Sequence, residues 1–360
     1  MSRVTFRSPL AFATTFLLIA ASARGAIIQT VLVGNPGNVA DVRYIPAGVG
    51  AVGYTYRIAA TEVSNAQYVE FLNGVDSGGA NGLGLYSLSQ TTDARGGIVF
   101  NNAAAPGAKY EVKPGRDNNP AIYISWYDAI RFTNWLHNGQ GHGDTENGAY
   151  TLIGGGPVPT NGATVTRNPG AAWWLPSQDE WYKAAYHKND GATDHYWDYA
   201  TGTNTVPFSD QPPGTDAPNT TNTANFFKND NVANGYDDGY AVTGSPTSSS
   251  LQNYLTDGGA YASARSPYGT FDQGGNVWEW NETLFGSLRG DRGGSWAMTA
   301  TSMHATNTGS SQPSFKNADF GFRVATAIPE PAATLLLTSA SAPLLARRRR
   351  RPLPPRRQPV

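Results

Sequence analysis

The residues best suited to chemistry lie in one short stretch, 271–280, whose sequence is FDQGGNVWEW. Its adjacent glycines let the backbone turn tightly or adopt positive φ. Asp272 and Glu279 place two carboxylates around that turn, and carboxylate oxygens are ligands for hard cations such as calcium. If the end of the stretch is a strand, Trp278 and Trp280 share one face and Glu279 points to the other. The same spacing also fits a buried aromatic strand whose glutamate faces solvent.

Four sequence blocks point to one protein family. The block GNVWEW at 275–280 resembles the signature of the sulfatase-modifying-factor family, whose best-known members are the formylglycine-generating enzymes. Three more blocks resemble motifs of that family and follow in the family's order: LPSQDEW at 175–181, RGGSW at 292–296 and GFRVA at 321–325. The similarity extends over about residues 56–325. It implies an α+β architecture, the sulfatase-modifying-factor variant of the C-type lectin fold.

Two or three helices must support these blocks, and their N-terminal serines are visible in the sequence. A serine followed three residues later by Gln or Glu has the spacing of a capping box, and an early aspartate is favoured by the helix dipole. With 41 Gly and 24 Pro, we expect short strands and long irregular loops elsewhere, including an ordered loop over 190–265. The predicted caps are Ser64 with Gln67, Ser125 with Asp128 in its first turn, and Ser177 with Glu180.

Composition limits the possible functions. Residues 26–328 carry 16 Lys and Arg against 26 Asp and Glu, a net charge of −10. An acidic body lacks the clustered cations that phosphate contacts require, which argues against nucleic-acid binding. The chain has no cysteine, which excludes disulfides, thiolate metal sites and cysteine nucleophiles.

The N-terminus has the three parts of a secretory signal. Arg3 and Arg7 precede a mostly apolar run, and Ala21-Ser22-Ala23 is an A-x-A cleavage site. We therefore assign residues 1–25 to a signal peptide removed by signal peptidase, and residues 26–327 to a single sulfatase-modifying-factor domain.

The C-terminus carries a second targeting signal. A P-E-P motif at 329–331 precedes a short apolar run and the arginines 347–351. This tail, 328–351, resembles the PEP-CTERM sorting signal, although the extension 352–360 is longer than usual. The resemblance implies transient membrane retention, cleavage by an exosortase, and export to the periplasm, outer surface or extracellular matrix of a diderm bacterium. A permanent tail anchor is the alternative.

The family resemblance also implies two calcium sites. The second site would use a side chain before the turn, two backbone carbonyls and the signature glutamate. These correspond to Asp272, Gly275, Val277 and Glu279. Asp272 stands where the family usually has Asn, which keeps the oxygen ligand.

The first calcium site is matched less closely. The family uses an Asn with the carbonyl that follows it, together with a D-x-[FY] pair. The best matches are Asn225, Phe226, Asp238 and Tyr240. Ordinary Asx turns would explain the same residues.

The family's substrate cleft and copper ligands can be carried over in the same way. Trp278 and Ser295 match residues beside the substrate pocket, although Ser295 could equally satisfy a turn. Formylglycine-generating enzymes bind Cu(I) through two cysteines, and Met298 and Met303 stand at those positions. Thioethers bind Cu(I) but form no thiolate, so we expect no copper cofactor.

These observations favour a non-catalytic function. We expect a secreted, calcium-stabilised lectin-like module that binds a surface or matrix ligand. One alternative is a formylglycine-generating oxidase acting on a sulfatase cysteine, against which the missing cysteines argue. Another is an extracellular matrix scaffold. Aromatic side chains exposed in a cleft would favour the binder, and a buried aromatic set would favour the scaffold.

Overall fold

A computed structural model describes residues 25–191 and 195–328. The predicted signal cleavage site at Ala21-Ser22-Ala23 and the sorting tail from Pro329 lie outside the described residues. All elements below belong to one compact unit that ends at Ile328. No helix in this described part combines the length and the apolar character needed to cross a membrane.

The three longest helices begin at the predicted caps. In each one, the cap hydroxyl accepts the backbone N–H three residues on, and the side chain at that position accepts the N–H of the cap. Asp128 therefore completes a capping box as well as lying in the first turn of its helix. The described residues form α1 (Asn65–Val75), α2 (Ser89–Thr92), α3 (Trp126–His137), α4 (Gln178–Tyr186) and α5 (Ala300–Met303).

Two four-stranded sheets and three two-stranded pairs complete the mixed α+β fold, as predicted. The first sheet has the order β1-β2-β14-β5: Thr30–Val33, Tyr56–Ala59, Ala325–Thr326 and Trp173–Trp174. The second has the order β12-β11-β10-β13: Gly309–Ser311, Leu288–Arg292, Trp278–Phe285 and Phe320–Phe322. The pairs are β3 (Ile98–Phe100) with β4 (Tyr110–Val112), β6 (Phe208–Ser209) with β7 (Thr223–Ala224), and β8 (Phe227–Asn229) with β9 (Asp238–Tyr240).

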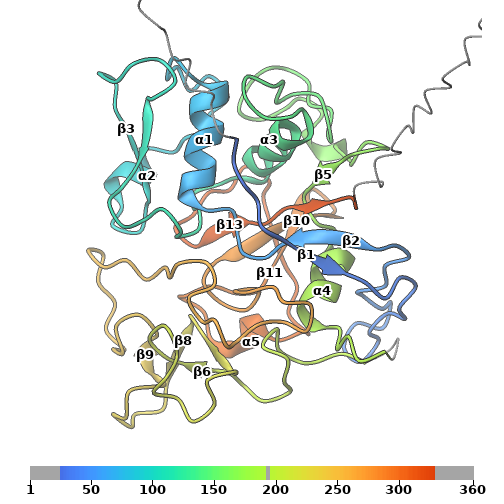
Figure 1. The fold of residues 1–360 in the computed structure, drawn as a ribbon, viewed down its shortest axis with the longest axis vertical. Coiled ribbons are helices and arrows are strands. Elements are labelled where there is room, and N and C mark those ends of the chain that lie inside the picture. Colours follow the sequence, from blue (N-terminus) through green and yellow to red (C-terminus); the bar gives the residue numbers. More distant parts are fainter. Residues whose placement is uncertain (1–24, 192–194, 329–360) are drawn as a thin grey trace, which may run out of the picture. The chain divides into compact units, whose positions relative to one another are not determined.

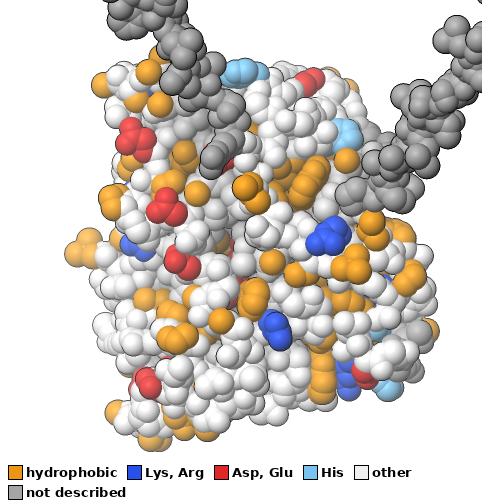
Figure 2. All heavy atoms as spheres, in the orientation of Figure 1, with side chains coloured by type: hydrophobic (Ala, Val, Ile, Leu, Met, Phe, Trp, Pro, Cys, Tyr) orange, Lys and Arg blue, Asp and Glu red, His pale blue; other side chains and the backbone are white. Residues whose placement is uncertain are grey.

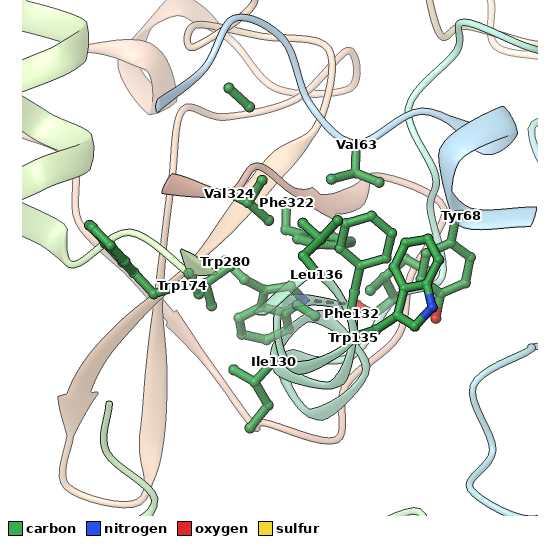
Figure 3. Close-up of a cluster of buried hydrophobic side chains, with 14 of the residues drawn as sticks. Val63, Tyr68, Ile130, Phe132, Trp135, Leu136, Trp174, Trp280, Phe322 and Val324 are labelled. Atoms are coloured by element: carbon green, nitrogen blue, oxygen red, sulfur yellow. Dashed lines mark hydrogen bonds between the residues drawn. The ribbon is translucent and has the colours of Figure 1, made fainter. Parts of the chain in front are cut away.

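The signature stretch ends as strand β10, at the centre of the second sheet. β10 pairs in parallel with β13, so that Trp278 lies opposite Phe320 and Trp280 opposite Phe322. The two tryptophans therefore share a face, as predicted, and Glu279 points to the other face. Figure 3 shows Trp280 and Phe322 meeting side chains of α3, including Phe132 and Leu136.

Helix α3 is buried on nearly all sides. Sequence periodicity predicts one apolar face, yet every residue from Trp126 to Leu136 is buried, including Arg131 and Asn134. The polar side chains are tolerated because they are paired. Arg131 forms an ion pair with Glu146, and Asn134 bonds the backbone of residues 145 and 150. Loop segments thus cover the side of α3 that faces away from the sheet.

The loop-rich region 195–265 is ordered where the structure describes it. Short strands β6 to β9 lie together with α5 on the side of the fold away from α1 and α3 (Figure 1). Aromatic contacts hold this region, such as Phe227 with Tyr240 and Phe208 with Tyr236. It supplies Asn225, which reaches the signature turn described next.

Candidate functional site

The signature turn requires backbone conformations that few residues accept. Asp272, Gly275 and Asn276 all have positive φ, at 58°, 90° and 59°. A Cβ on Gly275 would lie 2.3 Å from the carbonyl oxygen of Asn225, so only glycine fits there. The Asn276 side chain ties the turn to distant segments: it donates to Glu62 Oε1 at 3.0 Å and accepts from Asn225 Nδ2 at 3.1 Å.

Glu279 is buried and fully paired, so the alternative of a solvent-facing glutamate is wrong. Its Oε2 accepts from Arg323 Nε at 2.6 Å and from Trp181 Nε1 at 2.8 Å, and its Oε1 accepts from Arg323 Nη2 at 2.7 Å. The same guanidinium donates to the carbonyls of Ala59, Ala60 and Phe271. Arg323 therefore joins the end of β2, the start of the signature stretch and β10.

Two more carboxylates lie close to this ion pair. Burial and the charge of Asp272 raise the pKa of Glu62 well above its usual range. Burial raises the pKa of Asp272 to about 6. Glu62 Oε2 is buried and finds no hydrogen-bond partner among the described residues. Three carboxylates thus surround one guanidinium, and the cluster has an excess of negative charge when all are ionised.

The second predicted calcium site includes Asp272 and Glu279 of this cluster. Asp272 lines a cavity of about 10 Å³, which is the space that one water or ion needs. Hydroxyl and amide side chains of Thr201, Ser266, Thr270 and Gln273 share its wall. Within the described ranges, no three His, Cys, Asp or Glu side chains are placed to hold a metal. The charge and the oxygen donors fit a hard cation at Asp272, but Arg323 already engages both oxygens of Glu279.

The residues predicted for the first calcium site each make contacts within the domain. The Asn225 amide donates to the carbonyl of Tyr254, and the Phe226 carbonyl accepts from Ser209 Oγ. Asp238 caps a local turn, and Tyr240 packs on a neighbouring ring. These contacts are those of ordinary structure, as the Asx-turn alternative expects.

The buried carboxylate of this region is the preceding residue, Asp237. It is 2% exposed, accepts from the Ser209 N–H at 2.8 Å and pairs with Lys228 at 2.7 Å. A lysine therefore supplies the positive charge here, and the donor set does not fit calcium.

Ser295 lies in a buried polar cluster. Its Oγ donates to Asp319 Oδ2 at 2.9 Å, and both residues are buried. Burial raises the pKa of Asp319, whose Oδ1 has no partner in the part of the chain that is described. Trp278 donates its backbone N–H to the Asp319 carbonyl, but its ring stacks on Phe320. The two predicted binding residues thus meet at Asp319, while the Trp278 ring belongs to the main core.

A second layer of charged and aromatic side chains covers this cluster. Arg95 makes a bidentate pair with Asp93, at 2.7 and 2.8 Å, and lies over the Trp296 ring at 5.5 Å. Tyr123 donates to Asp93 at 2.6 Å from a backbone with φ of 54°. Although burial alone would raise it, the bonds from Arg95 and Tyr123 lower the pKa of Asp93 to about 2. We call Asp93, Arg95, Tyr123, Trp296 and Asp319, together with Ser295, the Ser295 cluster.

The sequence analysis identified only Ser295 of this cluster. Asp93 and Arg95 lie about 200 residues before it, in a Gly-rich segment without a motif. The one local signal was the spacing of Asp93 and Arg95, which permits a short-range ion pair. Positive φ at a bulky residue such as Tyr123 is rare and is concentrated at functional sites, yet it is invisible in the sequence.

The two methionines at the family's copper positions have different environments. Met303 is 1% exposed and packs with Tyr199, Ala224 and Phe226. Met298 is partly exposed, and its backbone bonds Ser295 and Phe227. Two neutral thioethers, one of them packed in an apolar cluster, do not match a thiolate copper site.

Comparisons with known proteins agree with the four sequence blocks. Residues 30–328 match the family model described as sulfatase-modifying factor enzyme 1-like domain. No curated protein matches the chain. Solved structures that it resembles include CarF, at 22% identity and a TM-score of 0.49, covering 84% of this chain and 99% of that one. Two others are variable protein 1 of Treponema denticola (17%, 0.46, 84% and 95%) and PvdO from Pseudomonas aeruginosa (15%, 0.40, 84% and 92%).

Proposed function

Because the chain belongs to the family of sulfatase-modifying factor enzyme 1-like domains, a variant of the C-type lectin fold, we propose that it is a non-catalytic, exported ligand-binding member of that family. One observation carries the proposal: methionines occupy both copper positions, and the sequence of 360 residues contains no cysteine. Thiolates are the strong donors that oxygen activation at copper requires, and thioethers remain neutral.

The Ser295 cluster is the proposed binding region. Strain at Tyr123, the buried Asp319 Oδ1 and the buried indole N–H of Trp296, neither atom having a partner within the described ranges, are features that native proteins rarely keep without a function. Arg95 adds a partly exposed cation at the edge of the Trp296 ring. The ligand in this proposal is a component of the cell surface or the extracellular matrix.

We further propose that calcium stabilises the domain at Asp272. The support is the ion-sized cavity beside this residue and the excess of carboxylates over guanidinium in the cluster. Asp272 would hold the ion. The family resemblance implies the carbonyls of Gly275 and Val277 as further ligands, although neither residue lines this cavity. A bound calcium would supply a positive charge and cross-link the loop.

An activity assay tests the non-catalytic proposal. The purified protein, supplied with Cu(I), oxygen and a cysteine peptide of the sulfatase type, should form no aldehyde above a copper-only control. Turnover in the wild-type protein that Met298→Ala abolishes would refute the proposal. Copper binding by a Met298→Cys, Met303→Cys double variant would show that the geometry is kept and only the ligands are lost.

A binding assay tests the proposal that the Ser295 cluster binds a matrix ligand. Matrix isolated from the producing cells should retain the wild-type protein, and the Asp93→Ala, Arg95→Ala double variant should be retained at least tenfold less. Removing both partners avoids leaving an uncompensated charge. The exposed Arg265→Ala variant is the matched control.

A matrix scaffold is the second candidate, and one observation favours it. Six of the nine tryptophans are buried and the others are partly buried, which is the aromatic burial expected of a scaffold. A scaffold would bind the matrix through other surfaces. If wild type and the double variant are retained equally, the result would favour the scaffold and contradict ligand binding by the Ser295 cluster.

A further inference from the structure

We propose that a cavity between α1 and α3 binds a neutral saccharide. The cavity has a volume of about 610 Å³, which is within the usual range for small-ligand sites. Residues of α1, the C-terminal part of α3 and the loop 139–142 line it, and the two helices lie side by side in Figure 1. The cavity shares no lining residue with the Ser295 cluster, so the inference goes beyond the proposed function.

The loop 139–142 is fixed against both helices before a ligand arrives. Trp135 donates its indole N–H to the Gly141 carbonyl at 2.9 Å, and the backbone N–H of Gln140 donates to the Trp135 carbonyl at 2.8 Å. The Gly141 carbonyl also lies close to α1, because a Cβ added to Gly74 would come within 2.5 Å of its oxygen. A wall that is already ordered loses little conformational freedom when a ligand binds.

Glycine leaves much of the wall as bare backbone. Five of the lining residues are glycines, and Gly107, Gly139 and Gly141 have open space where a side chain would begin. A ligand ring can therefore approach the peptide groups closely. Val69 and Trp135 add apolar surface to the same wall. A sugar ring has matching surfaces, since it carries hydroxyls at its edge and C–H groups on its faces.

The polar side chains of the wall suit hydroxyls, which both donate and accept. Asn73 and Gln140 bond backbone carbonyls and so hold the wall together. Glu70 and His142 are exposed and line the cavity. His142 Nδ1 bonds the Gly74 carbonyl at 2.8 Å. Because a carbonyl only accepts, Nδ1 carries the proton, and Nε2 is the ring nitrogen that remains for a ligand hydroxyl.

The charge of the wall argues against a charged ligand. Among the described residues that line the cavity, none is Lys or Arg. A phosphate, sulfate or carboxylate would therefore meet no countercharge there, and residues 26–328 carry a net charge of −10 that disfavours anions further. On the face shown in Figure 2, acidic side chains are scattered and form no continuous patch that would attract a polycation. One carboxylate that accepts from hydroxyls suits a neutral saccharide.

Titration calorimetry with a panel of disaccharides tests the proposal. The neutral probes are cellobiose, maltose, lactose and diacetylchitobiose, and the charged probes are digalacturonate and trilysine. We expect saturable binding of at least one neutral disaccharide to the wild-type protein, and at least tenfold weaker binding of each charged probe. If no neutral disaccharide binds, or if a charged probe binds as tightly, the proposal is overturned.

Two variants locate the site. Val69→Trp fills the cavity without changing any charge and should abolish binding, whereas Val232→Trp, at an exposed loop position, should leave it unchanged. Glu70→Ala removes the acceptor and should weaken binding at least fivefold, whereas Glu111→Ala, at an exposed position on β4, should not. Wild-type affinity in either Val69→Trp or Glu70→Ala would contradict the inference. Urea denaturation checks that each variant is folded, and Glu70→Ala decides alone if Val69→Trp does not fold.

One further variant separates this site from the Ser295 cluster. The Asp93→Ala, Arg95→Ala double variant changes no residue of the cavity wall and should bind the disaccharide as wild type does. Loss of disaccharide binding in that variant would assign the saccharide to the Ser295 cluster and overturn the inference. Matrix retention and disaccharide binding can therefore fail independently.

Discussion

At the scale of single residues, Arg323 contributes most to holding the signature stretch in place. Its guanidinium and Glu279 are both 0% exposed and form a bidentate ion pair with a shortest distance of 2.6 Å. A buried pair of this kind adds little net stability relative to apolar residues, but breaking it leaves one buried charge without a partner. Arg323 is therefore more important for which structure forms than for how stable that structure is.

Removing the charge of Glu279 alone should destabilise the protein strongly. Glu279→Gln removes the bidentate charged partner of the buried Arg323, and we expect the free energy of unfolding to fall by about 3–5 kcal/mol. Urea denaturation followed by tryptophan fluorescence measures the change. Arg265→Met, at an exposed position, is the control and should change it by less than about 0.5 kcal/mol. A loss below about 1 kcal/mol in Glu279→Gln would mean that the pair is not buried as described.

Asp291 makes stability depend on pH. Burial raises the pKa of this carboxyl to about 6, and Asp319 adds to the effect. The unfolded chain loses the proton near pH 4, so the folded state holds it more tightly. The contribution to stability is therefore fully present below pH 4 and is lost as the pH rises through about 6. From pH 4 to pH 8 it changes by on the order of 2–3 kcal/mol.

Asp291→Asn should flatten this pH dependence. We expect the variant to be more stable than wild type at pH 8 and to show a smaller difference at pH 4.5, as measured by urea denaturation at each pH. The exposed Asp117→Asn variant should retain the wild-type profile. If Asp291→Asn and wild type have parallel profiles, the buried carboxyl does not titrate as inferred.

At the scale of elements, the three main helices are fixed by their N-termini. Each begins with a serine in a complete capping box. In α3, the Asp128 carboxylate of the box also pairs with Lys316 at 2.6 Å, which ties the helix start to the segment before β13. The cap thus orients the most deeply buried helix against the sheet that carries the signature strand.

Removing one of these caps should cost a measurable amount. Ser125→Ala leaves the backbone N–H of Asp128 without its acceptor, and we expect a loss of about 1 kcal/mol in the free energy of unfolding. Ser314→Ala, in an exposed turn, is the matched control. Thermal and urea denaturation should rank the two variants in that order, and equal stability would show that the cap is dispensable.

At the scale of the whole molecule, the acidic body and its cluster of buried carboxylates lead us to expect a response to calcium. The body has a net charge of −10. Calcium at about 100 times its dissociation constant would add about 2.7 kcal/mol, which raises the melting temperature of a domain of this size by several degrees. A chelator should remove that increment.

Asp272→Gly tests the calcium proposal without adding backbone strain. Glycine accepts the φ of 58° at this position and removes the carboxylate. The melting temperature of the variant should not respond to calcium or chelator. Asn231→Gly, at a φ of 62° in an exposed loop, controls for the added flexibility and should respond as wild type does. If the melting temperature of the wild-type protein changes with neither calcium nor chelator, the calcium proposal is wrong.

The proposed export predicts the boundaries of the mature chain. Mass spectrometry of the native surface protein should find no peptides before the cleavage site at Ala21-Ser22-Ala23 and none beyond the P-E-P motif at 329–331. These segments lie outside the described residues, so the prediction rests on the sequence alone. Recovery of the arginines 347–351 on mature surface protein would support a permanent tail anchor instead.

The sequence by itself determined the local features and the family. Each capping box needs only a serine and a polar residue three positions later, because the bonds are made within one turn. Alternation in a strand likewise fixed the common face of Trp278 and Trp280. The absence of cysteine excludes thiolate metal ligands and cysteine nucleophiles, whatever the tertiary structure. These conclusions need no knowledge of which distant segments meet.

Only the tertiary structure decided what each of those residues contacts. Glu279 has its partner at Arg323, 44 positions away, and the ring of Trp296 is covered by Arg95 from a distant segment of the chain. Beside the hairpin β8–β9 the buried acid is Asp237, the residue before β9, and not Asp238, the first residue of β9. Long loops bring such groups together, and loop paths depend on the packing of the whole domain. Local sequence signals therefore predicted the starts of the three longest helices and the common face of the signature strand, and the fold alone determined the charges that meet.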